Sequence, residues 1–168
     1  MGKLRVFITN NQHVVKIPSG IRFLIRRCCH AVLSLEGIDN DTEISVSFVD
    51  NGKIKELNAK YRNKDIETDV LSFPLGDSNG FNIDEDGVLL LGDIVISFEK
   101  AKQQASYCGH SIQREVAYLT VHSMLHLLNY NHENGGIEAV HMREREEAIL
   151  NNIGLSRNGT YMDLNDDD

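Results

Sequence analysis

The chain has 168 residues, enough for one sizeable hydrophobic core but short for several ordinary domains. A formal net charge of −8 argues against a general nucleic-acid binder that works through overall positive charge. No apolar run approaches the roughly 20 residues that a membrane-spanning helix needs, and no secretory signal pattern opens the chain. Three cysteines without a C-x-x-C pair predict reduced thiols and a cytoplasmic protein.

The charge is unevenly distributed along the chain. Residues 1–64 hold 11 Lys and Arg against 6 Asp and Glu, a balance of +5. Residues 65–168 hold 6 against 19, a balance of −13. Such asymmetry allows a local basic surface that could meet phosphates, although solvated charge without a partner explains it equally well.

Hydrophobic periodicity predicts four strands and five helices. In chain order, we expect a strand at 4–9, a helix at 21–35 capped by Ser19, a strand at 43–49, a helix from 51 to 61, strands at 70–75 and 88–98, and helices at 98–108, 112–128 and 137–153. We expect a single domain over 1–158 and an acidic, disordered tail over 159–168. The predicted fold class is α+β, with a mixed sheet of about four strands covered by helices and a central metal-binding helix at 112–128. Pro74 implies that the third strand lies at an edge or ends pairing there, and such an edge could hold an extended substrate.

Three histidines give the strongest chemical signal. His122 and His126 are four residues apart, so they lie on one face of a helix and could bind one metal ion. His132 reaches the same ion only if the chain leaves the helix and turns back, and Asn129 and Asn131 tolerate the left-handed conformation that such a turn uses. Three imidazole ligands leave one open position on tetrahedral zinc, which is typical of a catalytic site. The pattern therefore predicts a catalytic zinc held by His122, His126 and His132.

Other candidate sites have ordinary structural explanations that remain open. Metzincin proteases share the histidine spacing, but they carry a catalytic Glu where this chain has Ser123. The acidic segment 82–87 resembles half of an EF-hand loop, although an Asp-Gly hairpin turn explains it better. Arg62 could bind a phosphate or pair with Asp65 or Asp69. The charged residues of the last helix, Glu146 among them, are expected on a solvated face.

Three blocks of the sequence resemble the YbeY family of bacterial single-strand endoribonucleases, which act in ribosomal RNA maturation and ribosome quality control. The main family motif, His-Gly-x-Leu-His-Leu-x-Gly-Tyr-Asp-His, matches residues 122–132. A second block matches Asn58, Tyr61-Arg62, Lys64-Asp65 and 68–74, and a third matches 91–96. Four residues depart from the family pattern: Ser123 and Asn129 replace glycines, Asn131 replaces an Asp, and Glu67 replaces a Pro.

The resemblance implies a zinc-dependent endoribonuclease that acts on single-stranded RNA, including 16S ribosomal RNA, with the ribosomal small subunit as partner. It implies catalytic roles for Arg62 and His122 and substrate binding by Arg62, Lys64 and Ser72. Zinc would activate a water or polarise a phosphoryl oxygen, and Arg62 would stabilise the phosphate charge in the transition state. The sequence does not distinguish attack by water from attack by the 2′-hydroxyl. Two other hypotheses stay open: a zinc hydrolase of another class, such as a peptidase, and a non-catalytic ribosome-associated factor with a structural zinc.

Overall fold

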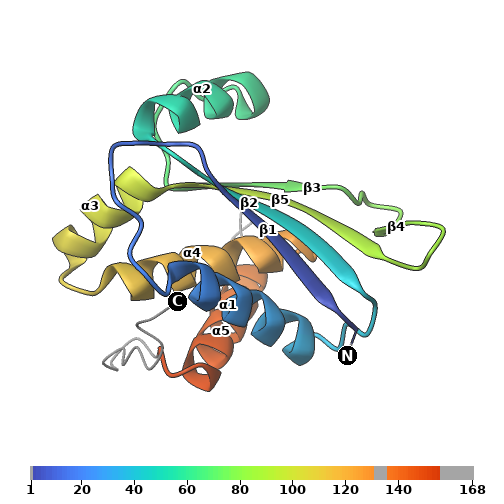
Figure 1. Cartoon of the computed structure of the whole chain (residues 1–168). Helices are drawn as coiled ribbons and strands as arrows, with labels where there is room; N and C mark the ends of the chain where they lie inside the picture. Colours follow the sequence, from blue (N-terminus) through green and yellow to red (C-terminus); the bar gives the residue numbers. More distant parts are fainter. Residues whose placement is uncertain (1, 131–135, 156–168) are drawn as a thin grey trace.

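The computed structural model describes residues 2–130 and 136–155. These residues form five strands and five helices (Figure 1). The strands are β1 (Leu4–Asn10), β2 (Thr42–Val49), β3 (Val70–Pro74), β4 (Asn82–Ile83) and β5 (Leu89–Ser97). The helices are α1 (Ile21–Leu35), α2 (Asn51–Arg62), α3 (Phe98–Cys108), α4 (Ile112–Leu127) and α5 (Gly136–Asn152).

The strands form one mixed sheet in the order β1-β2-β5-β3. β1, β2 and β5 run parallel to one another, whereas β3 pairs with β5 antiparallel and leaves its other edge unpaired by any described strand. The α+β class and the mixed sheet are confirmed. The fifth strand, β4, is a two-residue strand that pairs with β5 antiparallel.

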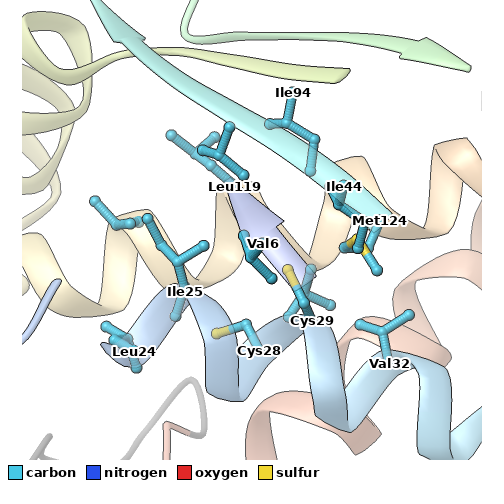
Figure 2. Packing of buried hydrophobic residues seen from close by; sticks show 14 of the residues in the cluster. Val6, Leu24, Ile25, Cys28, Cys29, Val32, Ile44, Ile94, Leu119 and Met124 are labelled. Carbon is cyan, nitrogen blue, oxygen red and sulfur yellow. The ribbon is translucent and has the colours of Figure 1, made fainter. Parts of the chain in front are cut away.

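Helices cover both faces of the sheet (Figure 1). α1 and α4 pack on one face with α5 beyond them, and α2 crosses the other face. Alternation along β2 explains the main core: Ile44, Val46 and Phe48 are buried, and the residues between them are only half-buried. Figure 2 shows this core, in which side chains of α1 and α4 meet the inner face of the strands. α4 thus packs against helices and strands on several sides, and this packing fixes the positions of its side chains.

Most predicted element boundaries fall within two residues of the observed ones. The prediction of Ser19 as the cap of α1 is wrong: Gly20 is the N-cap, in a left-handed conformation (φ 85°), without a side-chain cap bond. The segment at 82–87 is confirmed as a hairpin turn, because the Asp84 carboxylate accepts the N–H groups of Asp86 and Val88 between β4 and β5. None of the described helices combines the length and the apolarity needed to span a membrane. His132 and the tail at 159–168 lie outside the described residues, and the single-domain boundaries stay a prediction.

A bulge in β5 brings the sheet close to α4. The β2–β5 register shifts between Glu43 and Ile44, which places Gly92 opposite Ile44 with φ 150°, a conformation that L side chains rarely adopt. A Cβ at Gly92 would collide with the carbonyl oxygen of Phe73 and lie 2.9 Å from Cδ2 of Leu127 on α4. Glycine at this position therefore lets β3 and α4 approach each other.

We predict that Gly92→Ala lowers the free energy of unfolding by about 3 kcal/mol, through backbone strain and collision with Phe73. Urea unfolding measures the change. Gly52→Ala is the matched control, because Gly52 lies in the first turn of α2, where a Cβ would make only an ordinary contact, 3.6 Å from Asp50 Oδ1, and alanine favours a helix. Equal effects of the two substitutions would contradict this role of Gly92.

Candidate active site

The C-terminal end of α4 is closed by hydrogen bonds that fix the chain at His126. Asn129 adopts the predicted left-handed conformation (φ 74°). The Asn129 N–H donates to the His126 carbonyl at 2.9 Å, and the Tyr130 N–H donates to the Leu125 carbonyl at 2.9 Å. This is the Schellman pattern of helix ends, here with Asn in place of the usual glycine. The prediction that Asn129 ends the helix is confirmed.

Both imidazoles of α4 are held at their Nδ1 atoms. His122 Nδ1 lies 2.6 Å from Oε1 of Glu146 on α5, and His126 Nδ1 lies 2.9 Å from the Tyr130 carbonyl oxygen. Both partners are acceptors, so each Nδ1 is the donor to its partner and each Nε2 is the nitrogen left to coordinate a metal. The two Nε2 atoms lie 3.0 Å apart. The residues thus present two convergent nitrogen donors on one face of α4.

This donor pair fits a zinc ion. Two nitrogen ligands at about 2.0–2.1 Å from tetrahedral zinc lie about 3.4 Å apart, so a small opening of the observed pair accommodates the ion. A carboxylate or carbonyl on the second ring nitrogen is the usual support of a metal-binding histidine. Within residues 2–130 and 136–155, no group of three His, Cys, Asp or Glu side chains is placed to hold a metal. The third predicted ligand, His132, lies outside that part of the chain, so the metal site stays a prediction.

Glu146 is the main functional residue that sequence reasoning missed. The prediction of a solvated Glu146 is wrong, because its side chain is buried and bonded to His122. A signal was available: Glu146 lies in register with Met142, Ile149 and Leu150, which form the buried stripe of α5. A carboxylate on a buried stripe predicts a polar partner in the core, because burial of an unpaired charge is costly.

α5 also ties the end of α4 to α1. The Tyr130 hydroxyl lies 3.0 Å from each carboxylate oxygen of Glu36, which follows α1. Arg145 of α5 pairs with the same carboxylate at 3.3 Å. Because the Tyr130 carbonyl holds His126, this network fixes one imidazole from both neighbouring helices.

The histidines open into a cleft of about 720 Å³ beside the edge strand β3. Arg62 and Ser72 line the same cleft, but Lys64 does not. Arg62 makes no ion pair with Asp65 or Asp69 among the described residues. Its guanidinium instead donates to the Ser72 carbonyl of β3 and lies 5.2 Å from the centre of the Phe73 ring. The structure therefore brings Arg62, Ser72, His122 and His126 together.

Carboxylates lie behind the histidine side of the cleft. Tyr118 stacks on the His122 ring with 5.6 Å between ring centres. Burial, with added repulsion from Glu146 and Asp69, raises the pKa of Tyr118 to about 12, so the phenol stays neutral. Burial also raises the pKa of Glu115, which pairs with His110 at 3.2 Å. The cleft thus holds a cation at Arg62, a carboxylate at Asp69 and the imidazoles of His122 and His126, and Tyr118 and Glu146 contact His122.

Ser123 is fully buried beside the first histidine. Its Oγ has no hydrogen-bond partner within the described part of the chain. A buried position prevents it from acting as a general base toward a substrate. The orphan hydroxyl costs stability, because it loses water without gaining a bond.

We predict that Ser123→Ala raises the free energy of unfolding by about 1 kcal/mol, because it removes an unsatisfied buried hydroxyl. Thr120→Val is the control: Thr120 is equally buried, but its Oγ1 donates to the Val116 carbonyl at 2.8 Å, so its loss should be neutral or destabilising. Thermal unfolding of both variants measures the difference. A lower melting temperature for Ser123→Ala would show that the hydroxyl is satisfied after all.

Known proteins resemble the chain over most of its length. The family described as Endoribonuclease YbeY matches residues 7–154. The Endoribonuclease YbeY of Caldanaerobacter subterraneus subsp. tengcongensis is 49% identical over 160 residues, covering 92% of this chain and 100% of that protein. That of Alkaliphilus oremlandii is 47% identical over 155 residues, with the same coverage. The solution structure of TM1509 from Thermotoga maritima shares the fold, with a TM-score of 0.54 at 22% identity over 88% of this chain and 91% of that one. Extended matches at this identity show that the chain belongs to the endoribonuclease YbeY family.

Proposed function

We propose that this chain is a zinc-dependent endoribonuclease that cleaves single-stranded RNA in the cleft between α4 and β3. The observation that carries the proposal is the pair of Nε2 atoms 3.0 Å apart, each oriented by a hydrogen bond at Nδ1, in the same cleft as Arg62. Membership of the family supports endoribonuclease activity. Processing of 16S ribosomal RNA, association with the small ribosomal subunit and a cytoplasmic location extend this proposal. Free Cys28, Cys29 and Cys108 are consistent with a reducing compartment.

His122, His126 and His132 would hold the zinc, and Glu146 would orient His122. When bound, zinc supplies an electrophile for a phosphoryl oxygen and lowers the pKa of a coordinated water. Glu146 would keep the Nδ1 proton on His122, so that Nε2 is the nitrogen that coordinates the ion. The Tyr130 carbonyl does the same for His126. His122 therefore acts in catalysis through the ligand it provides.

Arg62 and the edge of β3 would hold the RNA. The guanidinium of Arg62 donates a hydrogen bond to the Ser72 carbonyl. A phosphate would be a stronger acceptor, because it can accept two hydrogen bonds from the same guanidinium. The stacked Phe73 keeps the planar group over the strand. Ser72 also lines the cleft and can contact the same strand of RNA. Lys64 is exposed outside the cleft lining, so we propose that it adds attraction at longer range.

The peptidase alternative lacks a general base at the position that follows His122. The position that carries the catalytic Glu in metzincins is Ser123, which is fully buried. RNA supplies its own nucleophile in the 2′-hydroxyl, so the base that takes the hydroxyl proton need not be a Glu, and attack by water remains equally compatible with the cleft. A non-catalytic factor with a structural zinc would have no need for Arg62 beside the imidazoles.

We predict that the purified chain binds about one zinc ion and that His126→Ala loses it, because an i, i+4 histidine pair supplies two of the ligands. Glu146→Gln should bind zinc about 10-fold to 100-fold more weakly, as expected when a supporting hydrogen-bond partner of a ligand is weakened. Elemental analysis gives the stoichiometry, and chelator competition gives the affinity. Equal zinc content in the wild type and His126→Ala would refute the assignment.

We predict that Arg62→Ala slows cleavage of single-stranded RNA by about 100-fold or more while zinc content stays unchanged, because it removes stabilisation of phosphate charge. Arg62→Lys should also be impaired, because a lysine cannot make the bidentate contact. Single-turnover kinetics on a labelled oligonucleotide measures the rate, and zinc removal should abolish it.

Arg5→Ala is the matched control, because Arg5 is exposed, lies on β1 and pairs only with Glu43 among the described residues. It should cleave at the wild-type rate. Full activity in Arg62→Ala together with a lowered melting temperature would assign Arg62 a purely structural role. Zinc-dependent hydrolysis of unfolded casein, lost in His122→Ala, would favour the peptidase alternative.

A further inference from the structure

A second hollow lies outside the cleft, between α1, β1 and the end of α5. Its volume is about 540 Å³. Arg26, Arg27 and His30 line it from α1, and none of the described residues that line it is acidic. Cavities of this size accommodate small organic ligands. The hollow is therefore large enough for one nucleotide.

The wall on α1 is a concentrated basic surface. Arg22, Arg26 and His30 follow one another at intervals of four residues, so they share a face of the helix. Arg22, Arg26 and Arg27 form no ion pair with a carboxylate of the described residues, whereas Arg5 and Arg145 each do. Unpaired guanidinium groups in a chain of net charge −8 indicate a surface for an anionic ligand.

Arg27 is held in place by the end of α5. Its Nη2 donates to the Ile153 carbonyl at 3.4 Å, and the side chain is half-buried. The carbonyl groups at a helix end are acceptors without a partner in the helix, so the guanidinium also stabilises α5. This contact uses one of the five N–H groups of the arginine. The guanidinium of Arg27 thus lies beside the end of α5 and keeps further N–H groups for a ligand.

The rest of the lining suits a nucleotide better than a bare anion. Leu4, Ala31 and Ile153 supply apolar surface on which the face of a base can pack. Ser34 and Asn152 supply hydroxyl and amide groups that can bond the edge of a base or a ribose. Guanidinium groups match phosphate oxygens in a bidentate manner.

We infer that this hollow binds one nucleotide unit of single-stranded RNA, with its phosphate on Arg26 and Arg27 and its base against Leu4, Ala31 and Ile153. The inference rests on the proposed function in taking RNA as the polymer. The hollow lies at β1 and the cleft at β3, at opposite edges of the sheet, so the hollow would bind its nucleotide separately from the cleaved bond.

Fluorescence anisotropy with the full-length chain tests the inference. The probe is a labelled 2′-O-methyl RNA of about 12 nucleotides, within the ordinary range of single-strand sites, with EDTA present so that cleavage plays no part. Arg26→Gln/Arg27→Gln should weaken binding about 10-fold at low salt and reduce the slope of log K against log salt by about 0.7 per lost phosphate contact. Lys55→Gln/Lys102→Gln removes the same charge from exposed lysines on α2 and α3, and should change the affinity less than twofold. Arg26→Gln alone should give an intermediate loss, and this variant keeps the contact between Arg27 and α5.

The outcomes separate the possible ligands. Wild-type affinity in Arg26→Gln/Arg27→Gln, or equal losses in both double variants, would overturn the inference. Adenosine monophosphate should shift the NMR signals of His30 in the wild type but not in the double variant; no shift would contradict a nucleotide site. Equally tight binding of an oligoglutamate peptide at the hollow would identify an acidic protein segment instead of RNA. Because no arm measures cleavage, a chain that binds RNA here but never cuts it would refute the proposed function and leave this inference standing.

Discussion

The hydrogen bonds at Nδ1 of His122 and His126 are the constraint on which the candidate active site depends. A histidine without such a partner can present either nitrogen and rotate its ring. Here the Glu146 carboxylate and the Tyr130 carbonyl remove that freedom, and the two Nε2 atoms converge to 3.0 Å. The Glu146 carboxylate is buried, where an unpaired charge is costly, so the bond to His122 serves the core as well as the site. Stability and chemistry thus rely on the same contact.

The surrounding fold makes these contacts possible. Asn129 ends α4 so that the Tyr130 carbonyl turns back toward His126, and the Tyr130 hydroxyl is secured by Glu36 and Arg145. On the other side of the cleft, Gly92 lets β3 lie close to α4, which brings Arg62 and Ser72 to the same opening. No described strand pairs with the outer edge of β3, and its Ser72 carbonyl accepts a hydrogen bond from the Arg62 guanidinium. The cleft is therefore bounded by a rigid helix end and by a strand with unused backbone groups.

Local patterns predicted much of this architecture, and long-range contacts explain what they could not. The alternation at 43–49 and the helical spacing at 21–35 reflect burial of one face, so those elements were identified with nearly correct limits. The i, i+4 spacing placed His122 and His126 together, and Asn129 was identified as the helix stop. Glu146, however, is 24 residues from His122, and Glu36 is 94 residues from Tyr130. A local sequence pattern does not show which carboxylate bonds which imidazole in the folded chain. Arg62 bonds the backbone carbonyl of Ser72, and a contact to the backbone does not depend on the identity of the side chain, so the sequence gives no sign of it.

The most direct test of the orientation of the histidines is long-range ¹H–¹⁵N NMR of the imidazoles with zinc bound. The account predicts that His122 and His126 both carry a proton on Nδ1 and coordinate through Nε2. In Glu146→Gln, the His122 ring should lose this uniform signature while His126 keeps it, because His126 is held by the Tyr130 carbonyl instead. Coordination through Nδ1, or imidazole resonances that do not respond to zinc, would contradict the account.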